Sequence, residues 1–516
     1  MGKKILLSAI LLISLGSVPA FSAGGFDAIK PADPLAEEPV FNTNQGIQLS
    51  IPKKATLTKN DVHNHYAIAL ERFIQCNVKS SYADFKMLIE TIVPNDYAYM
   101  KMAMNMADLG FFNLSELALS KVSDDSISNV LQDDIKHFYF PVFKLQPKDE
   151  VYLAEMFSNI IYNDQCREAV AEMLKNQQLL SNSDYANYLV ALGSLKANNI
   201  DDAQKYINNA IEKNPQNLNY KKLKAEIMLQ SKKPKNALKI VEDIKQQPLL
   251  SKEFINKVNS LEQYVLYKTV KQDPEKKYHL AYYYYYEGEL TKAIRTLQGA
   301  VTQKKKYNKD VYALTAKVYY DMKEYEKAES FAMKSKKLDS SNIMALMVLG
   351  DISYRKVDYK TALGYYEKAA SKEKKSTEPE IKTAQTCEHL GKTKQANEIY
   401  TKILKERSDC AMAYYNVGLN DKSRETEYLK KAVSLNIDFV DGWIALSKLA
   451  IDKQNYTAAK HYLAIAKYID ENDFRYYYYQ GLVCKAQGLI QDAVYNFRKS
   501  LSINPDFKPA KEELSI

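Results

Sequence analysis

The sequence predicts an all-α protein in which pairs of helices follow one another along the chain. A pattern of small and large residues recurs every 34 residues through the C-terminal two-thirds of the chain. Only 16 glycines and 15 prolines occur in 516 residues, which favours helices joined by short turns. Hydrophobic residues make up 46% and charged residues 26%, so the composition indicates a folded chain rather than a disordered one.

The first residues are typical of a secretory signal peptide, which we expect at 1–22. Two lysines precede an apolar run at 5–16, and the small residues Ala20, Ser22 and Ala23 offer cleavage sites. The run is shorter than the roughly 18–20 residues needed to span a bilayer, so we expect no stable transmembrane anchor. Whether the signal is cleaved or kept as an anchor stays open, with cleavage favoured. The protein is therefore expected to be exported to a periplasmic or extracellular location.

The last copy of the repeat, counted from Phe474 as place 1, shows the pattern most completely. Gly481, Ala493 and Ser500 put small residues at places 8, 20 and 27. Phe497 puts a large residue at place 24. Small side chains at such places let two helices approach closely, while the large ones fill the remaining space. The residues equivalent to Gly481 in other copies are Ala191, Ala225, Ala281, Ala316, Gly350, Ala384, Gly418 and Ser447.

This pattern resembles the tetratricopeptide repeat, a pair of antiparallel helices. The resemblance implies a right-handed superhelical solenoid of helix pairs, with a concave groove lined by the first helix of each pair. Together with the expected signal peptide, it points to an exported, bacterial-type member of the family. Some members hold a carboxylate with a Lys/Asn clamp at places 5 and 9. Here Lys222 stands at place 5, but Glu226 at place 9 would repel the ligand, so we expect no such clamp.

Two stretches depart from the period. Residues 252–273 have room for one helix only, and the copy at 411–439 is shorter than the others. The segments expected along the chain are a signal peptide (1–22), a proline-containing linker or extended arm (23–59), an irregular helical region with a degenerate repeat (60–149), a first repeat block (150–251), a spacer helix (252–273), a second repeat block (274–507) and a short C-terminal cap (508–516).

The sequence lacks the signatures of the common enzyme classes. The motifs GxGxxG, HExxH and GxSxG and the phosphate-binding GxxxxGK loop are absent, the five cysteines form no CxxC pair, and the six histidines are dispersed. We therefore expect no enzyme activity, no cofactor and no metal site. The net charge of +9 is small for the length, and the lysine clusters fall at expected turns, so no nucleic-acid partner is expected either.

Tyrosine is unusually abundant, with 40 residues in 516. In the repeat register, several tyrosines fall on the groove face of successive first helices. Tyrosine offers a large contact area and a polar tip, which suits a binding surface. The alternative is that these rings only pack between helices. The candidate partner-binding residues are Tyr278, Tyr282, Tyr285, Tyr286, Tyr320 and Tyr354.

These observations favour a non-catalytic protein–protein interaction scaffold of an exported compartment, with a protein or peptide partner in the groove and a role in envelope assembly or secretion. The alternative is an accessory module that recognises cell-wall or other glycans through the groove tyrosines. The sequence does not name the partner. Because only residues 508–516 are available to cap the last repeat, weak self-association through that repeat is also expected.

Export gives the first testable prediction. The mature protein should begin between Phe21 and Gly24, because signal peptidase cuts after small residues. N-terminal sequencing of the native protein measures this directly. An intact Met1 on a cytoplasmic species would contradict the prediction.

Overall fold

The computed structural model describes seven stretches of the chain, which contain 27 helices and no strand. The fold is therefore all-α, as expected. The expected signal peptide and nearly all of the expected linker lie outside the described residues. Among the helices that are described, none is both long and apolar enough to cross a membrane. The described residues are 59–91, 95–123, 140–142, 144–247, 252–301, 305–373 and 376–515.

The chain divides into two compact units. The first comprises residues 1–123 and 144–169, and the second comprises 124–143 and 170–516. The helices of the first unit are α2 (Lys59–Ile74), α3 (Val78–Thr91), α4 (Asp96–Asp108), α5 (Phe112–Leu119) and α7 (Pro147–Tyr162).

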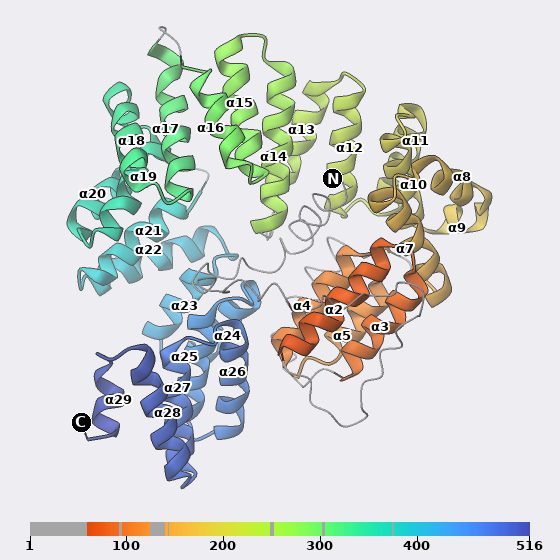
Figure 1. Cartoon of the computed structure of the whole chain (residues 1–516). Helices are drawn as coiled ribbons and strands as arrows, with labels where there is room; N and C mark the ends of the chain where they lie inside the picture. Colours follow the sequence, from red (N-terminus) through yellow and green to blue (C-terminus); the bar gives the residue numbers. More distant parts are fainter. Residues whose placement is uncertain are drawn as a thin grey trace, which may run out of the picture. The chain divides into compact units, whose positions relative to one another are not determined.

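The first unit contains two helix pairs, α2 with α3 and α4 with α5, which Figure 1 shows in red and orange. The hydroxyl of Ser81 donates to the carbonyl oxygen of Ala69 at 2.8 Å, and that of Ser115 donates to the carbonyl of Ala103 at 2.8 Å. The second contact repeats the first 34 positions later. The region expected to hold one degenerate repeat thus contains two equivalent helix pairs.

The second unit consists of consecutive helices, and from α9 onward they pack against their neighbours in the chain. The boundary between the two units falls within α8. In chain order the helices are α8 (Cys166–Lys175), α9 (Gln177–Asn182), α10 (Asp184–Lys196), α11 (Ile200–Lys213), α12 (Leu218–Gln230), α13 (Pro234–Lys245), α14 (Lys252–Thr269), α15 (Asp273–Tyr286), α16 (Leu290–Gln298), α17 (Lys305–Asp321), α18 (Tyr325–Leu338), α19 (Ile343–Arg355), α20 (Tyr359–Ala370), α21 (Glu378–His389), α22 (Thr393–Glu406), α23 (Ala411–Asn420), α24 (Glu425–Leu435), α25 (Val440–Asp452), α26 (Tyr456–Ile469), α27 (Phe474–Ala486), α28 (Ile490–Ile503) and α29 (Lys508–Glu513).

The repeat pattern reflects close contact between the two helices of a pair. A Cβ atom at Gly350 in α19 would collide with the ring of Tyr366 in α20. One at Gly481 in α27 would lie 2.5 Å from the ring of Phe497 in α28. In both pairs, the missing side chain at place 8 makes room for the buried ring at place 24.

The irregular segments also form helices. The stretch expected to be a spacer helix contains α14, which packs against α13 and α15. The two helices of the short copy, α23 and α24, have 10 and 11 residues. At the C-terminal end, Phe497 is buried, and Leu514 packs against the same cluster beyond the six-residue helix α29. The last repeat therefore buries Phe497, while Leu489, Ile490 and Tyr495 stay exposed.

Two glycines test the register of the repeat. Gly350→Ala should lower the free energy of unfolding by about 1–3 kcal/mol, because the added methyl group must displace the buried ring of Tyr366. Gly364→Ala in α20 is the matched control, since its Cβ would meet nothing within 4 Å. The control should be neutral, or stabilising by about 0.5–1 kcal/mol, because alanine favours helix. Urea denaturation followed by circular dichroism compares the two variants, and equal stabilities would contradict the register.

Candidate functional site

The candidate site is a cavity of about 790 Å³ lined mainly by α12, α14 and α15. We call it the α12–α15 groove. Its volume lies in the range of about 300–1,000 Å³ that is common for ligand sites in proteins. All its lining residues belong to the second compact unit.

Helix α12 contributes one face of charged and apolar side chains. Lys222, Glu226, Leu229 and Gln230 line the cavity, and they occupy the groove places 5, 9, 12 and 13 of their repeat. Asn217 caps the helix by accepting hydrogen bonds from the first backbone N–H groups, which fixes where this face begins. Lys222 and Glu226 form an ion pair one helical turn apart. Glu226, which we expected to repel a ligand carboxylate, thus neutralises the charge of Lys222.

Helix α14 forms the middle of the groove. Lys257, Leu261, Tyr264 and Lys268 recur at intervals of three and four residues, so they share one face of the helix. Its buried side chains pack into the core formed with α12 and α13, which holds the helix in place. The members of α14 in that core are Phe254, Val258, Leu261 and Val265.

Aromatic rings connect α14 to α15 inside the groove. The ring centroids of Tyr264 and Tyr283 lie 5.1 Å apart. The ammonium group of Lys268 lies 5.0 Å from the Tyr264 ring centroid, within the range of a cation–π interaction. The hydroxyl of Ser260 donates to Glu287 at 2.5 Å and ties α14 to the residue that follows α15. These contacts place an aromatic surface beside an ammonium group.

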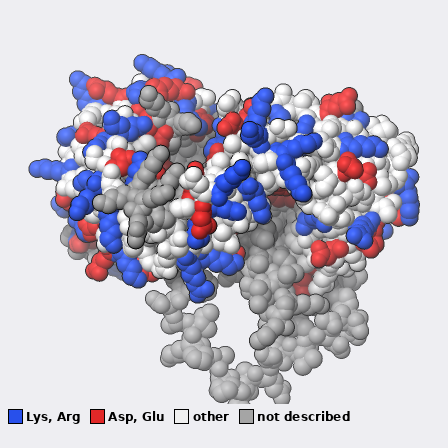
Figure 2. All heavy atoms as spheres, turned by 90° about the horizontal axis from the view of Figure 1, so that it is seen from above, with Lys and Arg blue, Asp and Glu red and all other residues white. Residues whose placement is uncertain are grey.

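The groove has more positive than negative side chains. Four lysines line it, namely Lys222, Lys232, Lys257 and Lys268, against the two carboxylates Glu226 and Glu287. By contrast, Lys and Arg are interspersed with Asp and Glu over the face of the described residues that Figure 2 shows. Lysines thus outnumber carboxylates by four to two in the lining of the groove.

Four of the six tyrosines expected to bind a partner form one cluster on α15. The rings of Tyr282 and Tyr286 are stacked with centroids 5.0 Å apart and planes 7° apart. Tyr278 packs edge-on against Tyr282 at 5.8 Å. Tyr285 packs against Tyr286 at 5.5 Å and donates its hydroxyl to Asp321 of α17 at 2.8 Å. Burial raises the pKa of all four hydroxyls, so they stay neutral donors at ordinary pH.

The other two tyrosines lie one and two repeats further along and contact the next helices. Tyr320 packs against Tyr325 at 5.5 Å, and the guanidinium of Arg355 lies 4.2 Å from the Tyr325 ring. These contacts connect α17, α18 and α19. Burial, followed by the charge of Asp351, raises the pKa of Tyr320 to about 12.

Tyr354 repeats this arrangement 34 residues later. It packs against Tyr359 at 5.1 Å, and the ring of His389 stacks on Tyr359 at 4.7 Å. The contacts connect α19, α20 and α21. The structure thus brings Tyr278, Tyr282, Tyr285 and Tyr286 together. It places Tyr320 and Tyr354 each against the second helix of its own repeat.

Sequence reasoning did not find the residues of α14. Tyr264, Lys257 and Lys268 were missed because the helix lies outside the 34-residue register. The repeat register puts Tyr283 off the groove face, among the residues that fill the core between helices, but the ring packs against Tyr264 and lines the groove. The spacing of Lys257, Leu261, Tyr264 and Lys268 was the available signal, because it marks a second face on a helix whose other face is apolar.

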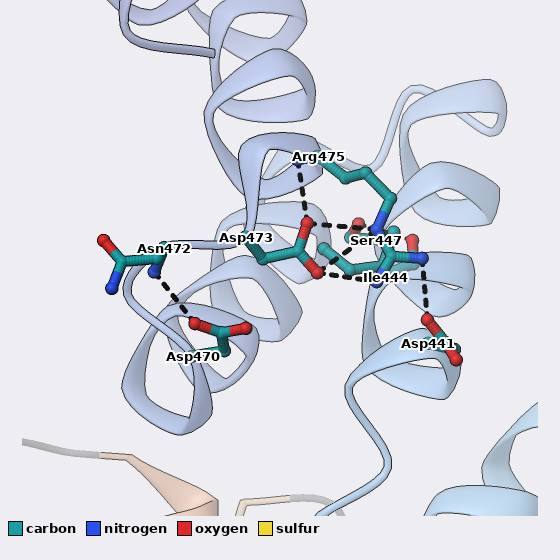
Figure 3. Close-up of polar contacts among 7 residues, drawn as sticks. All are labelled: Asp441, Ile444, Ser447, Asp470, Asn472, Asp473 and Arg475. Atoms are coloured by element: carbon teal, nitrogen blue, oxygen red, sulfur yellow. Dashed lines mark hydrogen bonds and ion pairs between the residues drawn. The ribbon is translucent and has the colours of Figure 1, made fainter. Parts of the chain in front are cut away.

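A second polar cluster, shown in Figure 3, connects the last two full repeats. Arg475 in α27 lies 2.7 Å from Asp441 in α25 and 2.6 Å from Asp473. Asp473 also caps α27 by accepting from the backbone N–H of Arg475 at 2.8 Å. The arginine is thus satisfied by two carboxylates, and the cluster holds repeats together. Within the described ranges, no three His, Cys, Asp or Glu side chains lie close enough to hold a metal ion.

The contacts of Tyr320 and Tyr354 give a prediction about their role. Changing both to Ala should lower the free energy of unfolding by roughly 1–3 kcal/mol, because each loses a ring contact between the two helices of its own repeat. Changing both to Phe keeps these ring contacts and should cost less than about 1 kcal/mol. Urea denaturation measures both. An Ala variant as stable as the parent would show that these rings do not hold the helix pairs together.

Comparisons with known proteins agree with this architecture. The family model described as tetratricopeptide repeat matches residues 310–342, which is the copy formed by α17 and α18. No curated protein matches the chain.

Three of the solved structures to which the chain is similar are the following. PilF of Pseudomonas aeruginosa is 16% identical, with 41% of this chain and 99% of that chain covered and a TM-score of 0.35. A tetratricopeptide repeat protein from Parabacteroides merdae is 16% identical, with 48% and 98% covered and a TM-score of 0.36. The Cut9–Hcn1 hetero-tetramer of the APC/C is 15% identical, with 89% and 96% covered and a TM-score of 0.43.

The matched copy is one of a series. The place 8 and place 24 contact recurs in the copies that hold Gly350 and Gly481, downstream of the match. The chain is therefore a tetratricopeptide-repeat protein.

Proposed function

We propose that this protein is a non-catalytic interaction scaffold that holds an extended segment of a partner protein in the α12–α15 groove. The observation that carries the proposal is the cavity itself, which is lined by the first-helix groove places of α12 together with residues of α14 and α15. Family scaffolds use this side of the array for binding. The groove combines leucines, tyrosines and lysines, a mixture typical of surfaces where a few aromatic anchors carry the affinity.

The groove is built on rigid elements, which supports a binding role. The buried residues of α12, α13 and α14 form one core, so both helices that flank the cavity are fixed from behind. A preformed site avoids much of the entropy loss that ordering a surface would cost on binding. A partner segment would therefore meet side chains that are already placed.

The tyrosines of α15 would extend the binding surface beyond the groove. Tyr283 and Glu287 line the cavity, while Tyr282 and Tyr286 stack on a neighbouring face of the same helix. A long segment could continue from the groove over this cluster, and then past Tyr320 and Tyr354. We propose that the protein does this after export, in the periplasm or outside the cell, during envelope assembly or secretion.

Site-specific photocrosslinking in living cells tests this function. A photoreactive residue at Gln230, which is exposed and lines the groove, should form adducts with a partner protein. The matched control is Gln247, which is equally exposed at the end of α13 but lies outside the groove lining. Adducts at Gln230 should weaken when Tyr264 is changed to Ala, because the ring forms part of the groove surface.

Two outcomes would contradict the proposal. One is the absence of protein adducts at Gln230. The other is an equal yield at Gln230 and Gln247, which would indicate random collisions. A glycan ligand would leave no protein adduct, and it would instead retain the protein on isolated cell-wall polymer in a manner that depends on the tyrosines.

A further inference from the structure

We propose that the α12–α15 groove selects an acidic peptide segment in which carboxylates flank an apolar or aromatic side chain. This inference rests on the proposed function, because it names the chemistry of the segment that the groove would hold. It depends on three features of the groove. Lysines outnumber carboxylates, the ammonium group of Lys268 lies beside aromatic rings, and Lys268 belongs to a helix outside the repeat register.

The charges of the groove are complementary to an acidic ligand. Of its two carboxylates, Glu226 is paired with Lys222, and Glu287 accepts the hydrogen bond from Ser260. In the stretches that the structure describes, no carboxylate lies within ion-pair distance of Lys232 or Lys268. A basic segment would meet uncompensated like charge, whereas an acidic one would supply the missing partners.

The ammonium group of Lys268 is held in place without being neutralised. It lies 5.0 Å from the ring of Tyr264 and 5.1 Å from that of Tyr267. Tyr267 also faces the ammonium of Lys276 at 5.3 Å. A ring orients a cation through its quadrupole but leaves the charge available to a carboxylate. A ligand carboxylate at Lys268 therefore needs little further ordering of this side chain.

The aromatic surface lies next to these charges. Tyr264 and Tyr283 are paired at 5.1 Å, and Leu229 and Leu261 line the same cavity. An apolar side chain of the ligand would lie on this surface while the flanking carboxylates reach the lysines. A fully charged segment would leave the rings unused, and a fully apolar one would leave the lysines desolvated and unpaired.

The repeat register alone does not provide this site. On α12 the ion pair between Lys222 and Glu226 leaves little net charge at places 5 and 9. The positive charge that is left without a nearby carboxylate comes from Lys268 of α14, together with Lys232 in the turn after α12. Selection for acidic segments is therefore a property of the helix between the two repeat blocks.

Selection of random peptides displayed on phage tests the inference with the full chain. Peptides recovered on the parent protein should be enriched in Asp and Glu next to Leu, Phe or Tyr. The Lys232→Gln/Lys268→Gln variant should bind the same synthetic peptides about 10-fold more weakly, because two complementary charges are lost. The matched control, Lys235→Gln/Lys239→Gln, removes the same charge from α13 outside the groove lining and should bind like the parent. Binding to the parent should also weaken as salt rises from about 0.05 to about 0.5 M.

The outcomes separate this inference from the proposed function. Peptides that need Tyr264 and Leu229 but show no acidic bias, or bind the lysine variant as tightly as the parent, would overturn acidic selection and leave the scaffold in place. If no recovered peptide depends on Tyr264 or Leu229, the groove is not a peptide site and both proposals fail. Circular dichroism of each variant confirms that its helices are retained, and the single change Lys268→Gln replaces the double variant if they are not.

Discussion

The close approach of two helices at a small residue is the constraint on which the rest of this structure depends. In the second unit, the missing side chain of Gly350 makes room for the buried ring of Tyr366. In the first unit, the small side chain of Ser81 lets α2 and α3 approach closely, and its hydroxyl donates a hydrogen bond to the carbonyl of Ala69. Each pair presents its remaining faces to the next pair, so the array gains stability by stacking. The groove inherits its rigidity from this stacking.

The fold could be predicted from the sequence wherever small residues recur at fixed places. The period of 34 residues was visible because alanine and glycine hold places 8 and 20 in most copies. The two N-terminal pairs were harder to recognise, because Ser81 and Ser115 replace the usual alanine and add hydrogen bonds that no residue pattern shows. Sequence reasoning therefore placed one degenerate repeat where the structure has two equivalent pairs.

The site was predictable only in the part that follows the repeat register. The register identifies Lys222 and Glu226 as groove residues, and both line the cavity. It gives no place to Tyr264, because α14 belongs to no repeat. The register also assigns Tyr283 to the core, because it assumes that α15 packs only against the second helix of its own repeat. In the structure α14 packs against α15 as well, and Tyr264 of α14 contacts Tyr283 in the groove. The position of an extra helix depends on tertiary packing that local periodicity does not encode.

The interruption of the array explains why the groove lies where it does. Between regular repeats, place 12 of one copy contacts place 13 of the next, as Tyr285 does with Asp321 and Tyr354 with His389. The helix that follows the α12–α13 pair is α14, which has no such place, and Leu229 at place 12 lines the cavity. Side chains that elsewhere contact the next repeat are thus free to contact a ligand in the cavity. A helix inserted out of register costs some regularity of packing, and the space it opens is where a partner segment can be held.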